Sequence, residues 1–123
     1  MQRNTLWSCA ANGQVRLPEN TQISDEKLTK YLLAPRKRND KSNWLAQAGY
    51  LLENWSILRD DLKRQVLPND ALLVETTDYG TMYEIRANLR GPNGKTLPVC
   101  TIWMVGTADD VARFITMYPD RKR

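Results

Sequence analysis

The sequence predicts a single α+β domain, and three observations support that fold class. At 123 residues the chain has the length of one domain with one hydrophobic core. Apolar residues recur at helical spacing before Pro68 and alternate with polar residues after it. Only short turns separate the alternating segments, so consecutive strands are antiparallel. We therefore expect N-terminal helices packed on one face of a four-stranded antiparallel sheet. The other face, here called the open face, is left uncovered.

The first 20 residues precede this regular pattern. They contain Gly13 and Pro18 and show no sustained helical or strand period. We interpret residues 1–20 as an N-terminal arm or linker and residues 21–123 as the single α+β domain.

Three helices are predicted before Pro68. The first is "SDEKLTKYLL", residues 24–33, in which Ser24 is a candidate N-cap and two acidic residues favour the first turn. Pro35 ends it, and a basic loop leads to a second helix in "SNWLAQAGYLL", residues 42–52. The third extends from about Asn54 to Val66, with apolar residues on one face and the charges of "RDDLKR" on the other.

Four strands are predicted after Pro68. They are rich in β-branched and aromatic residues and read "ALLVETTDY" (71–79), "TMYEIRANL" (81–89), "TLPVCTIWMV" (96–105) and "VARFITMYP" (111–119). Turn residues separate them at Tyr79-Gly80, at "GPNG" in 91–94 and at 106–110. The "GPNG" segment lacks the lysine and the following helix of a phosphate-binding loop, which favours a hairpin turn.

Composition excludes several kinds of catalytic site. The chain contains no histidine, so within it a histidine-based triad, general base or metal site is ruled out. Cys9 and Cys100 lie far apart, and no cysteine or carboxylate group has metal-ligand spacing. We expect no metal, no organic cofactor and reduced cysteines, while a disulfide between Cys9 and Cys100 stays open as an alternative.

The charge and hydropathy patterns indicate the kind of partner. Lys and Arg number 18 against 14 Asp and Glu, a net charge of +4 that is compatible with a polyanionic partner. No apolar run approaches the roughly 20 residues needed to span a bilayer, so we expect no membrane partner.

The segment "TMYEIRANL" places Glu84, Arg86 and Asn88 on one side of a strand and Tyr83 with Ile85 on the other. The polar side is either a solvated sheet face or the floor of a binding site. The basic loop between the first two helices favours the second interpretation, because its cations suit contact with phosphate groups. The candidate nucleic-acid-binding residues of this loop are Arg36, Lys37 and Arg38.

Several segments resemble an uncharacterised bacterial domain family that is found as small stand-alone proteins and in toxin-like contexts. These segments are "LPENTQISDEKLTKYLL", "NDKSNWLAQAGY", "YGTMYEI", "GPNGKTLPVCTIW" and "RFITMYP", and they extend from about Arg16 to Asp120. The order of helices and strands also resembles, more distantly, the superfamily of toxin ribonucleases that includes barnase, EndoU and RelE. The absence of histidine departs from the barnase and EndoU pattern, whereas RelE-like enzymes work with Lys, Arg and Tyr.

The resemblance implies catalytic residues on the open face. The matching positions are Lys41, Tyr83, Arg86, Thr101, Thr116 and Tyr118, to which the chemistry adds Glu84. RNA cleavage by its own 2′-hydroxyl needs a base, stabilisation of a doubly charged phosphorane-like state and a proton for the leaving oxygen. Arg86 and Lys41 are candidates for holding the phosphate, and either Glu84 or a Lys41 of lowered pKa for the base. Tyr118 or Thr116 would position or protonate the leaving group.

The sequence therefore predicts one of two functions. The first is a metal-independent toxin-type endoribonuclease acting on tRNA or mRNA in bacterial competition, such as contact-dependent inhibition, or in a toxin-antitoxin system. Such a toxin acts in the cytoplasm, can be delivered as the C-terminal part of a secreted effector, and has a cognate immunity or antitoxin protein that is expected to be acidic. The alternative is a non-enzymatic binding module, either an immunity-like or antitoxin-like protein or a nucleic-acid-binding protein.

Overall fold

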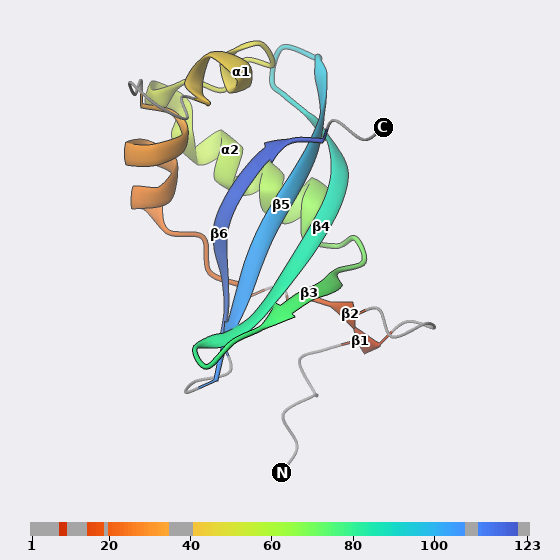
Figure 1. The fold of residues 1–123 in the computed structure, drawn as a ribbon. Coiled ribbons are helices and arrows are strands. Elements are labelled where there is room, and N and C mark those ends of the chain that lie inside the picture. Colours follow the sequence, from red (N-terminus) through yellow and green to blue (C-terminus); the bar gives the residue numbers. More distant parts are fainter. Residues whose placement is uncertain (1–7, 10–14, 19, 35–40, 108–110, 121–123) are drawn as a thin grey trace.

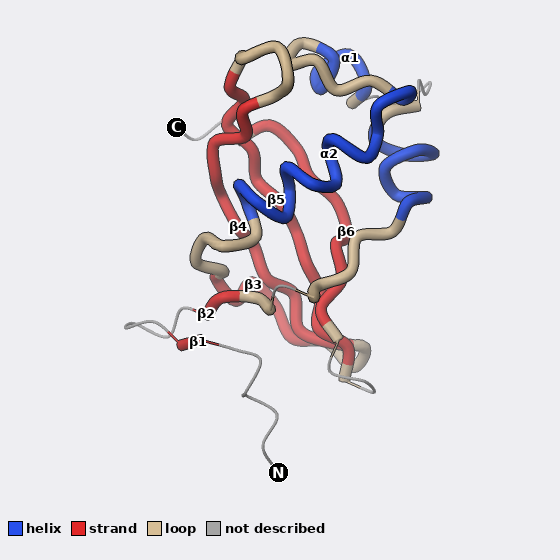
Figure 2. The backbone as a smooth tube through the Cα atoms, turned by 180° about the vertical axis from the view of Figure 1, so that it is seen from behind, coloured by secondary structure: helices blue, strands red, loops and turns tan. Residues whose placement is uncertain are grey.

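The protein folds as predicted into an α+β domain, described here from a computed structural model for residues 8–9, 15–18, 20–34, 41–107 and 111–120. Its centre is a four-stranded antiparallel sheet in the order β3-β4-β5-β6. The helices lie behind this sheet in Figure 1 and in front of it in Figure 2, so they cover one face and leave the open face uncovered.

The four strands of the main sheet lie where they were predicted, although the first ends at Thr76 and not at Tyr79, and Gly80 and Gly106, predicted as turn residues, belong to strands. They are β3 (Leu72–Thr76), β4 (Gly80–Arg90), β5 (Thr96–Gly106) and β6 (Ala112–Pro119). The residues "GPNG" form the hairpin turn between β4 and β5, closed by a 2.9 Å bond from the Gly91 amide to the Lys95 carbonyl. Within the predicted arm, β1 (Ser8–Cys9) and β2 (Val15–Arg16) form a separate antiparallel pair.

Five short helical segments are found in the described part of the helical half. They are η3 (Lys27–Leu32), α1 (Ser42–Ala46), η4 (Leu52–Asn54), α2 (Trp55–Asp61) and η5 (Leu62–Val66). The last two are continuous and match the predicted third helix. Both η3 and η5 are wound as wide π-type turns, with amide bonds that reach back five residues from Leu33 to Leu28 and from Leu67 to Leu62.

The second predicted helix is wrong beyond Ala46. Gly49 takes a left-handed conformation with φ of 94°, which ends the helix, and Leu51 is extended. The reason is tertiary, because the turn directs the completely buried Tyr50 into the core. Gly91 reinforces this arrangement: a Cβ atom there would lie 1.9 Å from the carbonyl oxygen of Ala48.

The core lies between the helices and the covered face of the sheet. Leu58, Leu62 and Val66 form the buried face predicted for the third helix, and Ile85, Leu89 and Trp103 meet them from the sheet. Trp44 and Trp55 pack at its margin. Tyr31 is half exposed, and Cys100 is a free buried thiol.

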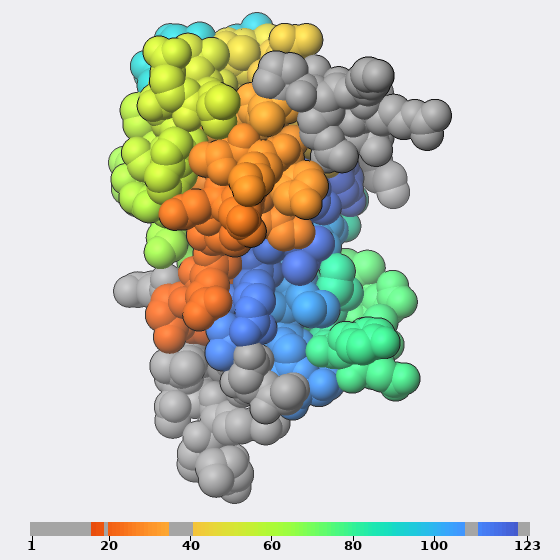
Figure 3. Space-filling view, turned by 90° about the vertical axis from the view of Figure 1, so that its left-hand side faces the viewer, coloured from red at the N-terminus to blue at the C-terminus, as the bar shows by residue number. Residues whose placement is uncertain are grey.

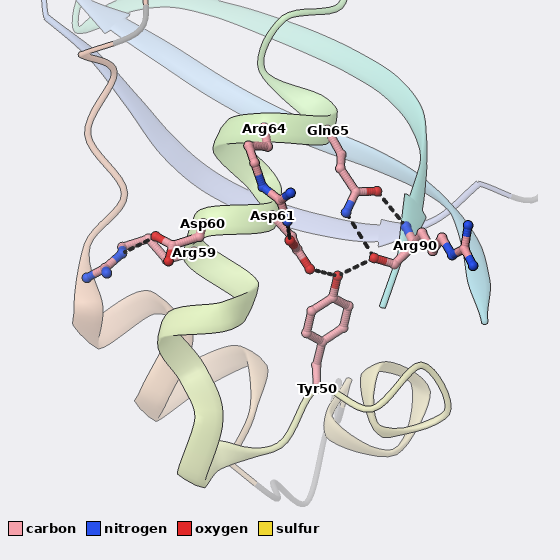
Figure 4. A network of polar contacts seen from close by, with 7 residues as sticks. All are labelled: Tyr50, Arg59, Asp60, Asp61, Arg64, Gln65 and Arg90. Carbon is pink, nitrogen blue, oxygen red and sulfur yellow. Dashed lines mark hydrogen bonds and ion pairs between the residues drawn. The ribbon is translucent and has the colours of Figure 1, made fainter. Parts of the chain in front are cut away.

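A buried polar network joins the helical half to the end of β4 (Figure 4). Asp61, predicted on the solvated face of the third helix, is instead buried and accepts a 2.6 Å hydrogen bond from the Tyr50 hydroxyl. The same hydroxyl lies 3.1 Å from the carbonyl oxygen of Arg90, and Arg64 pairs with the Asp61 carboxylate. Gln65 bonds both the amide and the carbonyl of Arg90.

We expect Tyr50→Phe to destabilise the domain by about 1–3 kcal/mol, because it leaves a buried carboxylate oxygen without its hydroxyl donor. The free energy of unfolding measured in urea tests this. Tyr79→Phe is the matched control, since Tyr79 is 81% exposed and should change that free energy by less than about 0.5 kcal/mol. Equal effects of the two substitutions would contradict the role given to the Tyr50 hydroxyl.

Candidate functional site

The strand register defines which side chains share the open face. Glu84 of β4 lies opposite Ile102 of β5, which lies opposite Thr116 of β6. Because directly paired residues project from the same face, these three side chains form one row across the sheet. Two residues further along β4, Arg86 begins a second row.

The second row contains Arg86, Cys100 and Tyr118, in that order across β4, β5 and β6. The rows place Glu84, Arg86, Thr116 and Tyr118 on a single surface, as the sequence predicted. They also add Cys100, which sequence reasoning did not include. In the sequence, Cys100 is marked only by its position in the strand that follows "TMYEIRANL". The sequence does not show which residues of that strand face the same side as Arg86.

Arg86 joins two carboxylates. Its Nε atom donates a 2.6 Å hydrogen bond to Glu84, and its Nη1 atom donates a 2.8 Å hydrogen bond to Asp120 just beyond β6. The Asp120 side chain is completely buried, whereas about a third of the Arg86 side chain is exposed. Asp120 was also missed, since it follows the last predicted strand and only the sheet brings it to Arg86. The bond with Glu84 raises the pKa of Arg86, and the charges of both carboxylates contribute further although burial opposes them.

Tyr118 and Cys100 form a second contact in the same row. The pKa of Tyr118 is raised to about 12. The largest cause is a hydrogen bond with the Cys100 thiol, and partial burial is the second. Burial raises the pKa of Cys100, while the bond from Tyr118 and the charge of Arg86 oppose that rise. Both groups are therefore protonated at neutral pH, and the phenol of Tyr118 is available as a proton donor.

Lys41 reaches the first row from the helical half. It precedes α1, and its Nζ atom donates a 3.1 Å hydrogen bond to the Thr116 hydroxyl. The structure thus joins Lys41 to β6, 75 residues away in the chain. This contact agrees with the expectation that Lys41 and Thr116 belong to one constellation.

Tyr83 and Thr101 do not share this surface. Tyr83 lies opposite Trp103 and packs against the core, on the face that the helices cover. Thr101 is completely buried on that face, where its hydroxyl donates to the Ile85 carbonyl and accepts from the Trp103 indole. The resemblance implied that both residues belong to the catalytic surface, and this expectation is wrong. Tyr83 is next to Glu84 in β4, and Thr101 pairs with Ile85, so both side chains project from the opposite face to Glu84 and Arg86.

A bulge in β6 decides which face Arg113 occupies. In a regular strand Arg113 would lie on the face opposite Thr116 and Tyr118, because odd and even positions alternate between the two faces. The register shifts between Ile102 and Trp103, so one extra residue of β6, Ile115, enters the strand. Arg113 then pairs with Met104 on the same face as Thr116.

One further concavity lies away from these residues. A groove of about 610 Å³ runs along the β6 edge beside residues 20–25, on the side of the molecule shown in Figure 3. Its lining includes Lys27, Lys63 and Arg113 but none of the predicted catalytic residues. The predicted nucleic-acid-binding residues Arg36, Lys37 and Arg38 lie outside the described residues. No helix in the described part of the chain has the length and apolarity to cross a membrane.

The fold and the residues on its open face define a small α+β domain with a titratable cluster on an uncovered antiparallel sheet. Residues 16–121 match the model of a domain of unknown function, DUF6883, and the chain belongs to that family. No match was found among curated proteins or among solved structures.

We expect Arg86→Ala to destabilise the domain, because it removes the cation that faces the buried carboxylate of Asp120. Adding Asp120→Asn should recover part of the loss, since the buried group is then neutral. Urea unfolding of the single and double variants measures this coupling, and strictly additive effects would contradict it.

We expect Cys100→Ala to lower the pKa of Tyr118 from about 12 toward its ordinary value, because the bond with Cys100 is the main cause of the rise. The elevated pKa favours the neutral phenol in the folded state. Its stabilising effect is complete below about pH 10 and is lost as the pH rises toward 12. Tyrosinate absorbance at about pH 11, corrected with Tyr118→Phe, should be larger in Cys100→Ala than in the parent. Cys100→Ser, which keeps a hydrogen-bonding group, is the control.

Proposed function

We propose that this domain is a metal-independent, toxin-type endoribonuclease that acts on tRNA or mRNA. The observation that carries the proposal is the row Arg86, Cys100 and Tyr118 beside Glu84 on the open face. It combines a carboxylate, a guanidinium and a protonated phenol on one rigid sheet, without histidine. The arrangement of helices on one face of an antiparallel sheet is also expected of barnase, EndoU and RelE-like toxins, and it supports the proposal as a fold-level analogy.

The proposed reaction is an attack of the RNA 2′-hydroxyl on the adjacent phosphorus. Glu84 accepts the hydroxyl proton, the bond between the 2′-oxygen and phosphorus forms, and the bond to the 5′-oxygen breaks. Tyr118 donates its proton to the leaving 5′-oxygen and recovers one from water, and Glu84 returns its proton to solvent. The product is a cyclic 2′,3′-phosphate, so neither an oxidant nor a metal enters the balance.

Arg86 and Lys41 hold the phosphate group in this proposal. Two nitrogen atoms of Arg86 bond Glu84 and Asp120, which fixes the plane of the guanidinium. Its remaining nitrogen, Nη2, bonds none of the described residues and would donate to a phosphate oxygen. Lys41, bonded to Thr116 at the next row, would supply a second cation.

The biological setting follows from this activity. The enzyme would act in the cytoplasm, in a toxin-antitoxin system or after delivery as the C-terminal part of a secreted effector. A cognate acidic protein that covers the open face would neutralise it, since complementary charge speeds and orients association.

We expect the purified protein to cleave tRNA or mRNA in the presence of a chelator and to leave the same sequence made as DNA intact. Glu84→Gln and Tyr118→Phe should each lower the cleavage rate by about a hundredfold or more, because each removes one proton-transfer group. Glu53→Gln and Tyr79→Phe are the matched controls, since both original residues are exposed, Glu53 on η4 and Tyr79 in the turn between β3 and β4. Urea unfolding of each variant separates loss of chemistry from loss of fold.

Growth of bacteria that express the protein from an inducible promoter provides the second measurement. Growth arrest that Tyr118→Phe relieves would support the proposal. A folded protein that neither cleaves RNA nor arrests growth would contradict it and would favour the alternative of a binding module.

A further inference from the structure

The groove of about 610 Å³ at the β6 edge has two walls that backbone hydrogen bonds hold together. Residues 20–25 form one wall and are joined to β6 by a parallel bridge between Gln22 and Arg113. In this bridge the Gln22 amide donates to the Ala112 carbonyl, and the Phe114 amide donates to the Gln22 carbonyl. Figure 3 shows this segment, in orange, against β6, in blue. The groove is therefore a fixed feature of the fold and not a gap between unconnected segments.

Three cations from separate elements line this groove. Lys27 lies on η3, Lys63 on η5 and Arg113 on β6. Among the described lining residues Asp25 is the one acidic group, so the lining carries a net positive charge. No ion pair in the described part of the chain involves Lys27 or Lys63, and the Lys27 ammonium lies 5.8 Å from the centre of the Tyr31 ring. A concavity lined mainly by one sign of charge attracts ligands of the opposite sign.

The groove adjoins the rows of polar side chains on the open face. Arg113 pairs with Met104 of β5, which lies two residues beyond Ile102. Its row is therefore the neighbour of the row that contains Glu84 and Thr116. Two residues of a strand span about 7 Å, so the groove begins within one such step of that row. A polyanion that is bound at one of these places can reach the other.

We propose that the groove is a second phosphate-binding subsite, which holds the backbone of the RNA strand on one side of the scissile phosphate. The inference rests on the proposed function, because its ligand is the RNA that is cleaved on the open face. RNA carries one negative charge per nucleotide, so a single strand supplies phosphates to both places. Lysine ammonium groups suit this task, because they attract phosphate as point charges and need no fixed geometry.

The subsite is expected to contact the RNA backbone and not the bases. Phe114, the aromatic residue of the described lining, is 2% exposed, so its ring is not available for base stacking. Contacts to phosphate carry no sequence information. Lys27 and Lys63 therefore strengthen the binding of any sequence and leave the chemistry at the scissile phosphate unchanged.

Binding of a single-stranded DNA of about 12 nucleotides tests the subsite without cleavage, because DNA lacks the 2′-hydroxyl that the proposed reaction uses. We expect the double variant Lys27→Gln, Lys63→Gln to raise the dissociation constant about fivefold or more. The slope of its logarithm against the logarithm of the salt concentration should fall by about 1.4, or about 0.7 for each phosphate contact that is lost. Asp25→Asn should lower the dissociation constant, because it removes the opposing charge.

Lys30→Gln with Lys95→Gln is the matched control, because it removes the same charge from two exposed lysines that do not line the groove. Urea unfolding checks that each variant is folded. A folded groove variant that binds with the affinity and salt slope of the parent would overturn the inference, and so would an equal loss in the control. Displacement of the DNA by poly-glutamate at the same concentration of charge would favour an acidic peptide as the occupant and would also overturn it.

Cleavage of RNA of two lengths separates this inference from the proposed function. A dinucleotide contains only the scissile phosphate and does not reach the groove, so the groove variant should cleave it at the rate of the parent. With longer RNA the same variant should raise KM and leave kcat unchanged. Equal loss of activity on both lengths would refute the subsite. A protein that cleaves neither RNA contradicts the proposed function alone, while the DNA measurement still decides whether the groove binds phosphate.

Discussion

The antiparallel register between β4 and β5 is the constraint on which the site depends. It pairs every residue of β4 with a residue of β5, from Gly80 with Gly106 to Arg90 with Thr96. A slip of one residue would exchange the two faces of a strand and bury the charges of Glu84 and Arg86 under the helices. The helical half secures this register, since the core side chains of β4 fit beneath α2 and η5, and Tyr50 and Gln65 bond the backbone of Arg90 at the end of the strand.

The two carboxylates that pair with Arg86 determine how this arginine can act on the open face. Arg86 is held between a largely buried carboxylate, Glu84, and a fully buried one, Asp120. Its orientation is therefore fixed, and part of its charge is already balanced. Such a group suits a task that needs direction more than net positive charge, such as donating a hydrogen bond to a phosphate oxygen. Lys41, whose ammonium group bonds the neutral hydroxyl of Thr116, contributes charge on the same surface.

The open face and the β3 edge have different chemistry although they adjoin. The open face presents titratable groups that are arranged in rows, whereas β3 presents leucine and valine on both of its sides. Leu72, which lies beside Glu84, is where the two surfaces meet.

The sequence by itself determined the fold class, the four strands, the third helix and the alternation that separates Glu84 and Arg86 from the core. Those features depend on local periodicity and turn residues, which a single chain displays directly. Only the tertiary structure decided that Thr101 faces the core, that the bulge at Ile115 turns Arg113 to the open face, and that Asp61 is buried beside Tyr50. It also decided that Cys100 and Asp120 join Arg86. Strand parity, bulges and the burial of a charge depend on partners that are distant in the chain, and no local pattern encodes them.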